Sequence, residues 1–204
     1  IARRQRQMCI RDRVGVARTL RFVAGREDLF KSHGGGLNEQ KKVFDTVKEG
    51  EVIVIEARQE SGSGTLGDIL ALRAKVRGAA GVVTDGGVRD YEAVKEIGLP
   101  VFTQGAHPCV LGRKHVPWDS DIAVSCGNAT VVPGDIIVGD DDGVVVIPRD
   151  IAADVAESAL AKEHEDEWVA SQVETGASLD GLFPPTGANK EAYIAFRDGK
   201  AGDQ

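Results

Sequence analysis

The stretch LGDILALRAKVRGAAGVVTDGGVRD, residues 66–90, decides the predicted fold because a helical pattern and a strand pattern follow each other within it. The apolar residues at helical spacing in its first half are Leu66, Ile69, Leu70 and Ala74. Gly78 is placed to end that helix, and residues 81–84 form a short apolar strand that runs into a glycine-rich turn. A helix that leads into a buried strand is typical of a βαβ unit with parallel strands.

On both sides of this stretch the alternation of strands and helices continues. The expected strands cover residues 14–24, 52–55 and 100–103, and the expected helices cover residues 37–48 and 91–97. A polar loop around the glycines at 34–36 is expected between the first strand and the first helix. The expected apolar stripe of that helix consists of Leu37, Val43, Phe44 and Val47. These segments predict an α/β half with parallel strands.

From residue 121 the pattern changes to short apolar runs separated by turn signals, which predicts β-hairpins. The runs cover residues 122–125, 130–132, 136–138 and 144–147. A long acidic helix is expected at residues 151–173, followed by a tail that continues to Gln204. The predicted fold class is therefore α/β, with a mixed sheet in a single domain and a long C-terminal helix.

The length and composition agree with one soluble domain. A chain of 204 residues suits a single hydrophobic core, and no apolar run approaches the length of a membrane helix. The formal charge of −7 argues against a nucleic-acid surface, which relies on clustered Lys and Arg. Cys9, Cys109 and Cys126 have no CxxC spacing, so neither a zinc site nor a disulfide framework is expected. The chain is predicted to be cytoplasmic and to bind neither membranes nor nucleic acids.

The first thirteen residues, IARRQRQMCIRDR, do not read as the start of a domain. They contain five arginines without helical or strand periodicity. This segment resembles translated sequencing-adapter read-through, and a genuine basic arm is the alternative. The expected organisation is a non-native segment at residues 1–13, the domain at residues 14–185 and a helical tail at residues 186–204.

Two loops carry the residue types that point to chemistry. Gly67 and Asp68 lie where a glycine-rich loop becomes the first turn of a helix, so the backbone N–H groups there can bind a carboxylate. The alternative is that Asp68 simply starts the helix. The next strand runs into Arg89 and Asp90, and loops at the carboxyl ends of parallel strands meet in one crevice. Arg89 can bind a carboxylate or an enolate oxygen, and Asp90 can bind magnesium. A salt bridge that caps the following helix is the alternative for this pair.

Asp68, twenty intervening residues and then Arg89-Asp90 resemble the signature of the class II pyruvate aldolases related to the regulator of ribonuclease activity A. Residues 66–90 and the stretch VVPGDIIVGDDDGVVVIP, residues 131–148, look like the two most recognisable segments of that family. The resemblance extends over residues 14–185. Near its end, ASLDGLFPPT is similar to the tail of bacterial members known as ribonuclease activity regulators.

The resemblance implies a swivelling β/β/α domain of the phosphohistidine-domain type, in a homotrimer or hexamer with active sites between subunits. It also implies a lyase that cleaves 4-hydroxy-4-methyl-2-oxoglutarate, or a related hydroxy-oxo acid, to pyruvate and decarboxylates oxaloacetate. Carried over by position, the substrate-binding residues are Gly67, Asp68, Ile69, Leu70 and Arg89. Asp90 is the implied ligand of Mg²⁺ or Mn²⁺. Arg89 and Asp68 are the implied catalytic residues, with Asp68 orienting Arg89 or a metal-bound water.

Two other functions are compatible with the sequence. One is a non-enzymatic regulator that binds ribonuclease E, as the family name implies. The other is dinucleotide binding, because Gly62, Gly64 and Gly67 satisfy the pattern GxGxxG and Asp85 follows the next strand, where a ribose-binding acid belongs. Against the dinucleotide, several residues separate the preceding strand from Gly62, and the second half of the chain consists of hairpins.

Two further groups of residues are interpreted as structural. The run from Asp140 to Asp142 lies between two apolar strands, so a hairpin turn is expected there rather than a metal site. His107, His115 and Trp118 fall in one loop-rich stretch and have the residue types of a pocket wall. Lone histidines more often fill or cap structure, and this role is predicted for them.

Overall fold

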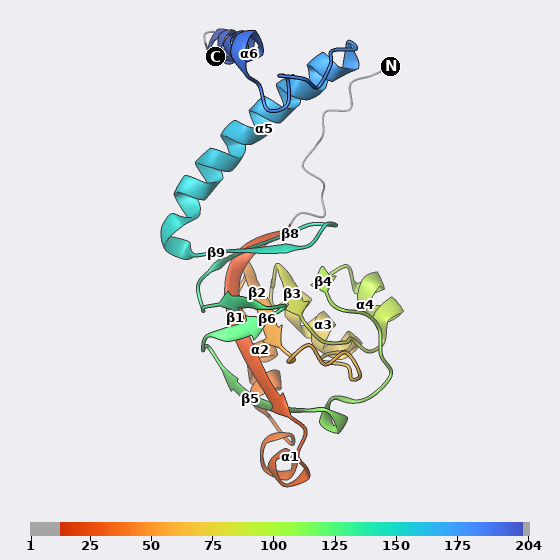
Figure 1. Cartoon of the computed structure of the whole chain (residues 1–204). Coiled ribbons are helices and arrows are strands. Elements are labelled where there is room, and N and C mark those ends of the chain that lie inside the picture. Colours follow the sequence, from red (N-terminus) through yellow and green to blue (C-terminus); the bar gives the residue numbers. More distant parts are fainter. Residues whose placement is uncertain (1–12, 202–204) are drawn as a thin grey trace. The chain divides into compact units, whose positions relative to one another are not determined.

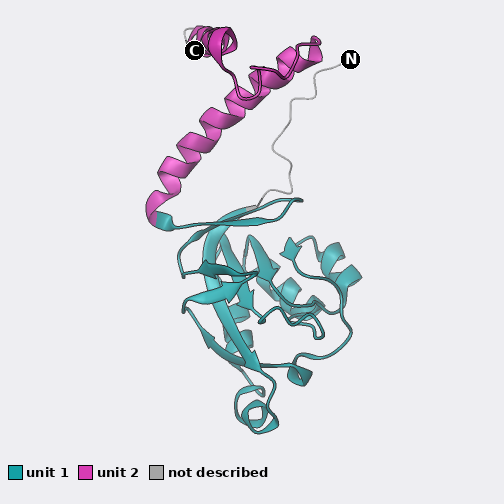
Figure 2. Ribbon diagram, viewed as in Figure 1, with its two compact units in different colours: residues 1–149 teal, residues 150–204 magenta. Residues whose placement is uncertain are grey.

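The structure is a computed structural model and describes residues 13–201 of the chain (Figure 1). The chain divides into two compact units, residues 1–149 and residues 150–204 (Figure 2). The domain boundary expected after residue 185 therefore lies inside the second unit. Residues 1–12, and with them nearly all of the segment predicted to be non-native, lie outside the described residues. Arg13 begins the first strand and pairs with Gly139.

Seven strands of the described chain form one mixed sheet, which confirms the predicted fold class. The parallel strands are β1 (Arg13–Ala24), β2 (Glu51–Glu56), β3 (Gly81–Thr84) and β4 (Val101–Phe102). The antiparallel strands are β5 (His115–Ser120), β8 (Ile136–Gly139) and β9 (Val144–Ile147). The order is β4-β3-β2-β1-β8-β9, and β5 pairs with the second half of β1. A separate ribbon consists of β6 (Val124–Cys126) and β7 (Ala129–Val131).

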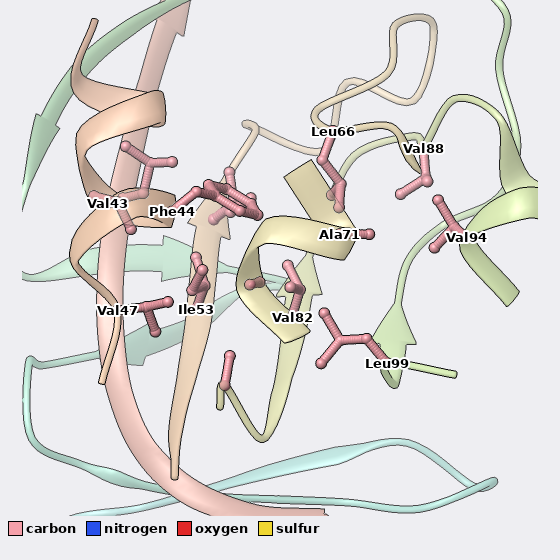
Figure 3. Packing of buried hydrophobic residues seen from close by; sticks show 14 of the residues in the cluster. Val43, Phe44, Val47, Ile53, Leu66, Ala71, Val82, Val88, Val94 and Leu99 are labelled. Atoms are coloured by element: carbon pink, nitrogen blue, oxygen red, sulfur yellow. The ribbon is translucent and has the colours of Figure 1, made fainter. Parts of the chain in front are cut away.

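Three helices of the first unit supply the main hydrophobic core together with the sheet: α2 (Glu39–Thr46), α3 (Asp68–Val76) and α4 (Tyr91–Ile97). The predicted stripe residues Val43, Phe44 and Val47 are fully buried and cluster with Ile53 of β2 (Figure 3). Burying a large apolar side chain stabilises the fold by roughly 1.5–3 kcal/mol. This cluster therefore holds the helices in place beside the carboxyl ends of β2 and β3.

Two residues of the predicted apolar stripes are not in the core. Leu37 is 62% exposed and lies before α2 begins, and Ile69 is 72% exposed. On α3 the buried residues are Ala74, as predicted, and Ala71, which was not part of the predicted stripe. Ile69 is two residues from Ala71, and successive helical residues are about 100° apart, so its side chain points away from the core. Its assignment to the apolar stripe is wrong.

One α-helix and one β-strand of the first unit are absent from the sequence prediction. Helix α1 (Glu27–His33) occupies part of the expected polar loop, and none of its described residues is buried, so it has no apolar stripe to reveal it. Strand β5 has the sequence HVPWDS, in which Pro117 and Asp119 obscure the strand pattern. Its pairing with β1 supplies the partners that the local sequence does not show.

The second face of the sheet has its own apolar cluster, which includes Val54 of β2, Val131 of β7 and Ile137 of β8. The sheet curls, because a Cβ at Gly139 of β8 would lie 2.6 Å from the ring of Phe102 on β4. These two strands are not neighbours in the hydrogen-bonded order. The curl encloses a cavity of about 260 Å³ lined mainly by valines and other small apolar residues.

The second unit contains the predicted acidic helix, α5 (Ala152–Glu174), and the tail helix α6 (Gly187–Ala201). Trp168, Val169, Leu182 and Tyr193 form its buried cluster. Short 3₁₀ turns cover Leu111–Arg113 (η1) in the first unit and Arg149–Ile151 (η2) at the border of the two units. Among the described helices, no segment combines the length and the apolar character of a membrane span.

Candidate active site

The loop before α3 and the loop after β3 run side by side, as their positions in the sequence predict. The Thr65 amide and its hydroxyl donate to the Gly87 carbonyl oxygen over 2.7 and 2.9 Å. The Arg89 amide donates to the Leu66 carbonyl oxygen over 2.9 Å. Gln40 of α2 also donates to the Thr65 carbonyl oxygen. Backbone groups and the buried Thr65 hydroxyl therefore hold the two loops together, and the exposed side chains are not needed for this.

Glycines allow Arg89 and Asp90 to lie directly against the first loop. A Cβ at Gly64 would lie 2.2 Å from Cγ of Arg89, a distance shorter than Cβ contacts in real proteins. A Cβ at Gly67 would lie 2.8 Å from Oδ2 of Asp90 and 3.5 Å from Nη2 of Arg89. A side chain at Gly64 or Gly67 would thus displace the two residues that the sequence predicts to act. The glycine pattern has a packing reason here that does not involve a dinucleotide.

Asp90 occupies the N-cap position of α4, but its side chain does not cap the helix. Its backbone is left-handed, with φ 54° and ψ 39°, and its side chain makes no cap hydrogen bond within the described residues. A left-handed backbone is costly for most residues other than glycine and is enriched at functional sites. An ion pair joins Arg89 Nη2 to Asp90 Oδ2 over 3.5 Å, and the side chains are 38% and 48% exposed. The ion pair of the alternative interpretation is present, whereas its helix cap is absent.

Asp68 is the first residue of α3, and Gly67 is the N-cap. The Asp68 carboxylate accepts a hydrogen bond from the Ile69 amide over 2.8 Å. An acidic residue in the first turn stabilises a helix by roughly 0.3–1 kcal/mol through the helix dipole. The structure therefore agrees with a helix-start role for Asp68, and its catalytic role stays a prediction.

A cleft of about 560 Å³ opens beside the paired loops. Of the predicted substrate-binding residues, Gly67, Leu70 and Arg89 line it, whereas Asp68 and Ile69 do not. The predicted metal ligand Asp90 is not among its lining residues either. The opposite wall comes from α1, the start of α2 and η1, and it includes Phe30, Lys41 and Arg113. None of these three residues belongs to a motif of the sequence. Their only sequence signal is residue type, because far-apart segments bring them to the cleft.

Asp85, which the dinucleotide interpretation requires, is already engaged by the fold. Its side chain is buried, and its two oxygens accept hydrogen bonds from the amides of Ala57 and Gln59 over 2.5 and 3.0 Å. The Gly127 amide lies 3.4 Å from Oδ2. This carboxylate pins the loop that follows β2 to the end of β3. It is not free to bind a ribose, which removes the residue that the dinucleotide pattern needs.

The residues interpreted as structural have structural partners. His115 is fully buried, and its ring lies 5.5 Å from the ring of Phe22. Burial, followed by the charge of nearby Arg58, lowers the pKa of His115 from 6.5 to about 4. His107 Nδ1 accepts a hydrogen bond from the Cys109 amide over 3.1 Å. Asp140 accepts from the amides of Asp142 and Gly143, as in a hairpin turn between β8 and β9.

The residues around Asp90 fit a magnesium-type cation better than a zinc-type one. Among the described residues, no group of three or more His, Cys, Asp or Glu side chains is placed to hold a metal. Zinc sites need such a group of three or four protein ligands. Magnesium is commonly held by one or two carboxylates and keeps water and substrate oxygens as its other ligands. The exposed carboxylate of Asp90, with no cap hydrogen bond among the described residues, suits that role.

Residues 2–146 match the family described as "RraA-like: Aldolase/RraA". A Halalkalibacterium halodurans protein named "Putative 4-hydroxy-4-methyl-2-oxoglutarate aldolase" is 34% identical over 154 residues, covering 76% of this chain and 68% of the relative. A protein of the same name from Aromatoleum aromaticum is 35% identical over 133 residues, covering 58% and 83%.

Among solved structures, Streptomyces coelicolor RraAS2 is similar with a TM-score of 0.68 and 35% identity. The similarity covers 77% of this chain and 75% of that one. RraAS2 is described as an unusual member of the RNase ES inhibitor RraA protein family. The similar curled mixed sheet confirms the fold class that the sequence resemblance implied.

Proposed function

The chain belongs to the RraA-like family, and on this premise we propose that it is a class II pyruvate aldolase. Its proposed reaction is retro-aldol cleavage of 4-hydroxy-4-methyl-2-oxoglutarate, or a related hydroxy-oxo acid, to pyruvate. The observation that carries this proposal is the pair Arg89 and Asp90, held with exposed side chains against a glycine loop beside a cleft. The names of two relatives that are about a third identical support the same reaction.

In the proposed mechanism Arg89 binds the pyruvyl end of the substrate. Its guanidinium forms paired hydrogen bonds with a carboxylate or stabilises negative charge on the neighbouring keto oxygen. Cleavage breaks the bond between C3 and C4, and the 4-hydroxyl loses its proton as it becomes a carbonyl. The bonding electrons move to the pyruvyl fragment as an enolate, whose C3 then takes up a proton. Arg89 acts where that negative charge develops.

The residues at the start of α3 have separate roles in this proposal. The amides of Gly67, Asp68, Ile69 and Leu70 lie at the N-cap and the first turn of α3, where helix N–H groups without helical partners favour a carboxylate. The Ile69 amide donates to the Asp68 carboxylate in the structure, so it would have to exchange this partner for the substrate. Asp68 acts as a positioning residue for Arg89 or for a water that transfers the proton. Asp90 would hold Mg²⁺ or Mn²⁺, which supplies an electron sink when it is bound.

The test measures pyruvate release from the full chain with 4-hydroxy-4-methyl-2-oxoglutarate and with oxaloacetate. We expect release from both acids in the presence of Mg²⁺ or Mn²⁺, because both reactions pass through the same enolate. A chelator should abolish release, and added metal should restore it. Arg89→Ala should lower kcat/KM by about a hundredfold, by analogy with the loss of an oxyanion donor. Activity that persists in chelator would contradict the metal-dependent mechanism.

A second candidate function is regulation of a ribonuclease, because the similar structure of RraAS2 belongs to an RNase inhibitor family. The proposed partner is a ribonuclease of the E type. Retention of a partner ribonuclease by the immobilised full chain would support this function. Absence of pyruvate release together with such retention would favour the regulator over the aldolase. Homotrimeric or hexameric assembly and a cytoplasmic location stay predictions, which gel filtration and cell fractionation would check.

A further inference from the structure

The cleft beside Arg89 is cationic, although the chain as a whole carries a formal charge of −7. Its described lining contains three basic side chains, Lys41, Arg89 and Arg113, and no aspartate or glutamate. The remaining wall is neutral and includes the apolar side chains of Phe30, Leu70 and Leu111. Basic groups that gather in a cleft of an acidic protein raise the local concentration of anions. Arg89 alone can bind one substrate carboxylate, so Lys41 and Arg113 are available for a second anionic group.

These additional charges are not neutralised by the fold. Within the described residues, Arg113 has neither an ion pair nor a side-chain hydrogen bond to a protein group. Lys41 Nζ donates to the Gly36 carbonyl oxygen over 2.6 Å, which leaves its positive charge without a carboxylate partner in that part of the chain. By contrast, the neighbours of the two residues are paired: Lys42 with Glu39 at 3.1 Å and Lys114 with Glu60 at 3.6 Å. Among the described residues, Lys41 and Arg113 therefore have no carboxylate partner, whereas Lys42 and Lys114 have one each.

The segment before Arg113 is hydrogen-bonded to the loop before α3, and this loop contacts Arg89. The Gly64 amide donates to the Cys109 carbonyl oxygen over 2.9 Å, and the Ser63 hydroxyl donates to the Val110 carbonyl oxygen over 3.0 Å. Gly64 is also the residue that packs against Arg89. These hydrogen bonds tie the segment before Arg113 to the loop that packs against Arg89, and both arginines line the same cleft.

Phe30 closes the same wall from the side of α1. A Cβ at Gly34 or at Gly112 would lie 2.5 Å from its ring, so the ring fills the space between these two glycines. Gly112 immediately precedes Arg113 and lies in η1. An apolar ring beside a cation suits a ligand whose carbon chain ends in a charged group.

We propose that Arg113 and Lys41 form a second anion subsite that binds a carboxylate at the far end of the substrate. One carboxylate of the proposed dicarboxylate substrate then binds at Arg89, and the other binds at Arg113. This inference rests on the proposed function for the orientation of the substrate, because the first carboxylate is assigned to Arg89. Phe30, Leu70 and Leu111 contact the carbon chain between the charged ends. Arg113 and Lys41 are specificity residues and take no part in bond cleavage.

The kinetic test compares two substrates that differ only at the far end. They are 4-hydroxy-4-methyl-2-oxoglutarate and 4-hydroxy-4-methyl-2-oxopentanoate, in which a methyl group replaces the far carboxylate. Arg113→Gln should lower kcat/KM for the dicarboxylate by about tenfold or more, as expected for a lost charge-assisted hydrogen bond, and leave the monocarboxylate unchanged. Lys41→Gln should shift the same ratio in the same direction. Arg113→Lys, which keeps the charge, should retain most of the preference.

The matched controls are Lys42→Gln and Lys114→Gln, which remove the same charge one residue away from each cleft cation. Both controls should leave the preference for the dicarboxylate as it is in the unaltered chain. An equal loss for both substrates in Arg113→Gln would overturn the subsite. A loss of preference in the controls as large as in the cleft variants would also overturn it, because net charge would then explain the effect.

A binding measurement separates failure of this inference from failure of the proposed reaction. Calorimetric titration would give the Kd of 2-oxoglutarate and of 2-oxopentanoate, which share five carbons and differ in the far carboxylate. We expect a lower Kd for 2-oxoglutarate than for 2-oxopentanoate. Arg113→Gln should reduce the ratio of the two Kd values by a factor of about ten or more. If the chain releases no pyruvate but shows this pattern, the subsite stands and the lyase assignment falls. Equal affinity for both acids in the unaltered chain overturns the subsite.

Discussion

The loop that follows β3 begins with one aspartate and ends with another, and the two are built into the molecule in opposite ways. Asp85 is 4% exposed and accepts hydrogen bonds from the amides of Ala57 and Gln59. Asp90 has a side chain that is 48% exposed, a left-handed backbone and no helix-cap bond among the described residues. Two aspartates that are five residues apart in one loop can therefore differ completely in their surroundings. Burial and hydrogen bonds make Asp85 part of the fold, whereas the Asp90 side chain stays exposed.

The largest expected effect lies at the Asp90 end. Asp90→Asn removes the negative charge, while asparagine tolerates the left-handed backbone well, so the fold should remain intact. If Asp90 holds the metal, kcat/KM for pyruvate release should fall by about a hundredfold to a thousandfold. The free energy of unfolding, measured by urea denaturation, should change by less than about 0.5 kcal/mol. A variant with full activity would remove Asp90 from the site.

A substitution at Asp85 should lower stability and leave activity nearly unchanged, the opposite of what is expected at Asp90. Asp85→Asn replaces one accepting oxygen by an NH₂ group that faces a backbone N–H donor. One buried amide then loses its acceptor, which costs roughly 1–3 kcal/mol of stability. Urea denaturation should show this loss, and the KM and kcat of the remaining folded protein should stay close to those of the unaltered chain. A variant that keeps its stability and loses activity would reverse the roles assigned to the two aspartates.

A third contrast, of similar size, concerns pH and the surroundings of Asp85. His115 of β5 lies beside Arg58, and Arg58 belongs to the loop that Asp85 holds. The folded chain holds the pKa of His115 at about 4, below its ordinary 6.5, since burial disfavours the charged ring. Between these values the unfolded chain binds a proton that the folded chain does not bind. Stability from this group is therefore full above pH 6.5 and is lost as the pH falls towards 4.

The expected loss over that interval is about 2–3 kcal/mol for a single histidine with this shift. Urea denaturation at pH 7 and pH 4 would measure it in the unaltered chain and in His115→Gln. The difference between the two pH values should be smaller in the variant by that amount. Equal pH dependence in both proteins would show that His115 is not buried as a neutral ring.

Local patterns were enough to predict most of the first unit. The expected strand at residues 81–84 and helix at residues 91–97 coincide with β3 and α4. Strand β2 and helix α2 differ from prediction only at their ends, and the second half contains the expected hairpin of β8 and β9. These elements bury a face with a clear period, so the sequence carries their signal. Helix α1, without buried residues, and strand β5, paired through long-range contacts, carry no such signal.

The candidate site was predicted in part, for a similar reason. Gly67, Arg89 and Asp90 come together as their loops predict, because carboxyl ends of neighbouring parallel strands meet at one edge of the sheet. Ile69 and Asp68 do not line the cleft. Lys41 and Arg113 line it but could not be chosen from the sequence, since nothing in the local pattern distinguishes them from Lys42 and Lys114.

By itself, the sequence determined most of the strands and helices, that the sheet is mixed, and which two loops hold the candidate site residues. Those properties depend on periodicity, turns and spacing within a few tens of residues. The tertiary structure alone decided that Asp85 is structural, that Asp90 is exposed, and that Lys41 and Arg113 face the cleft. Burial and the pairing of charges depend on contacts between segments far apart in the chain, and a linear pattern does not contain those contacts.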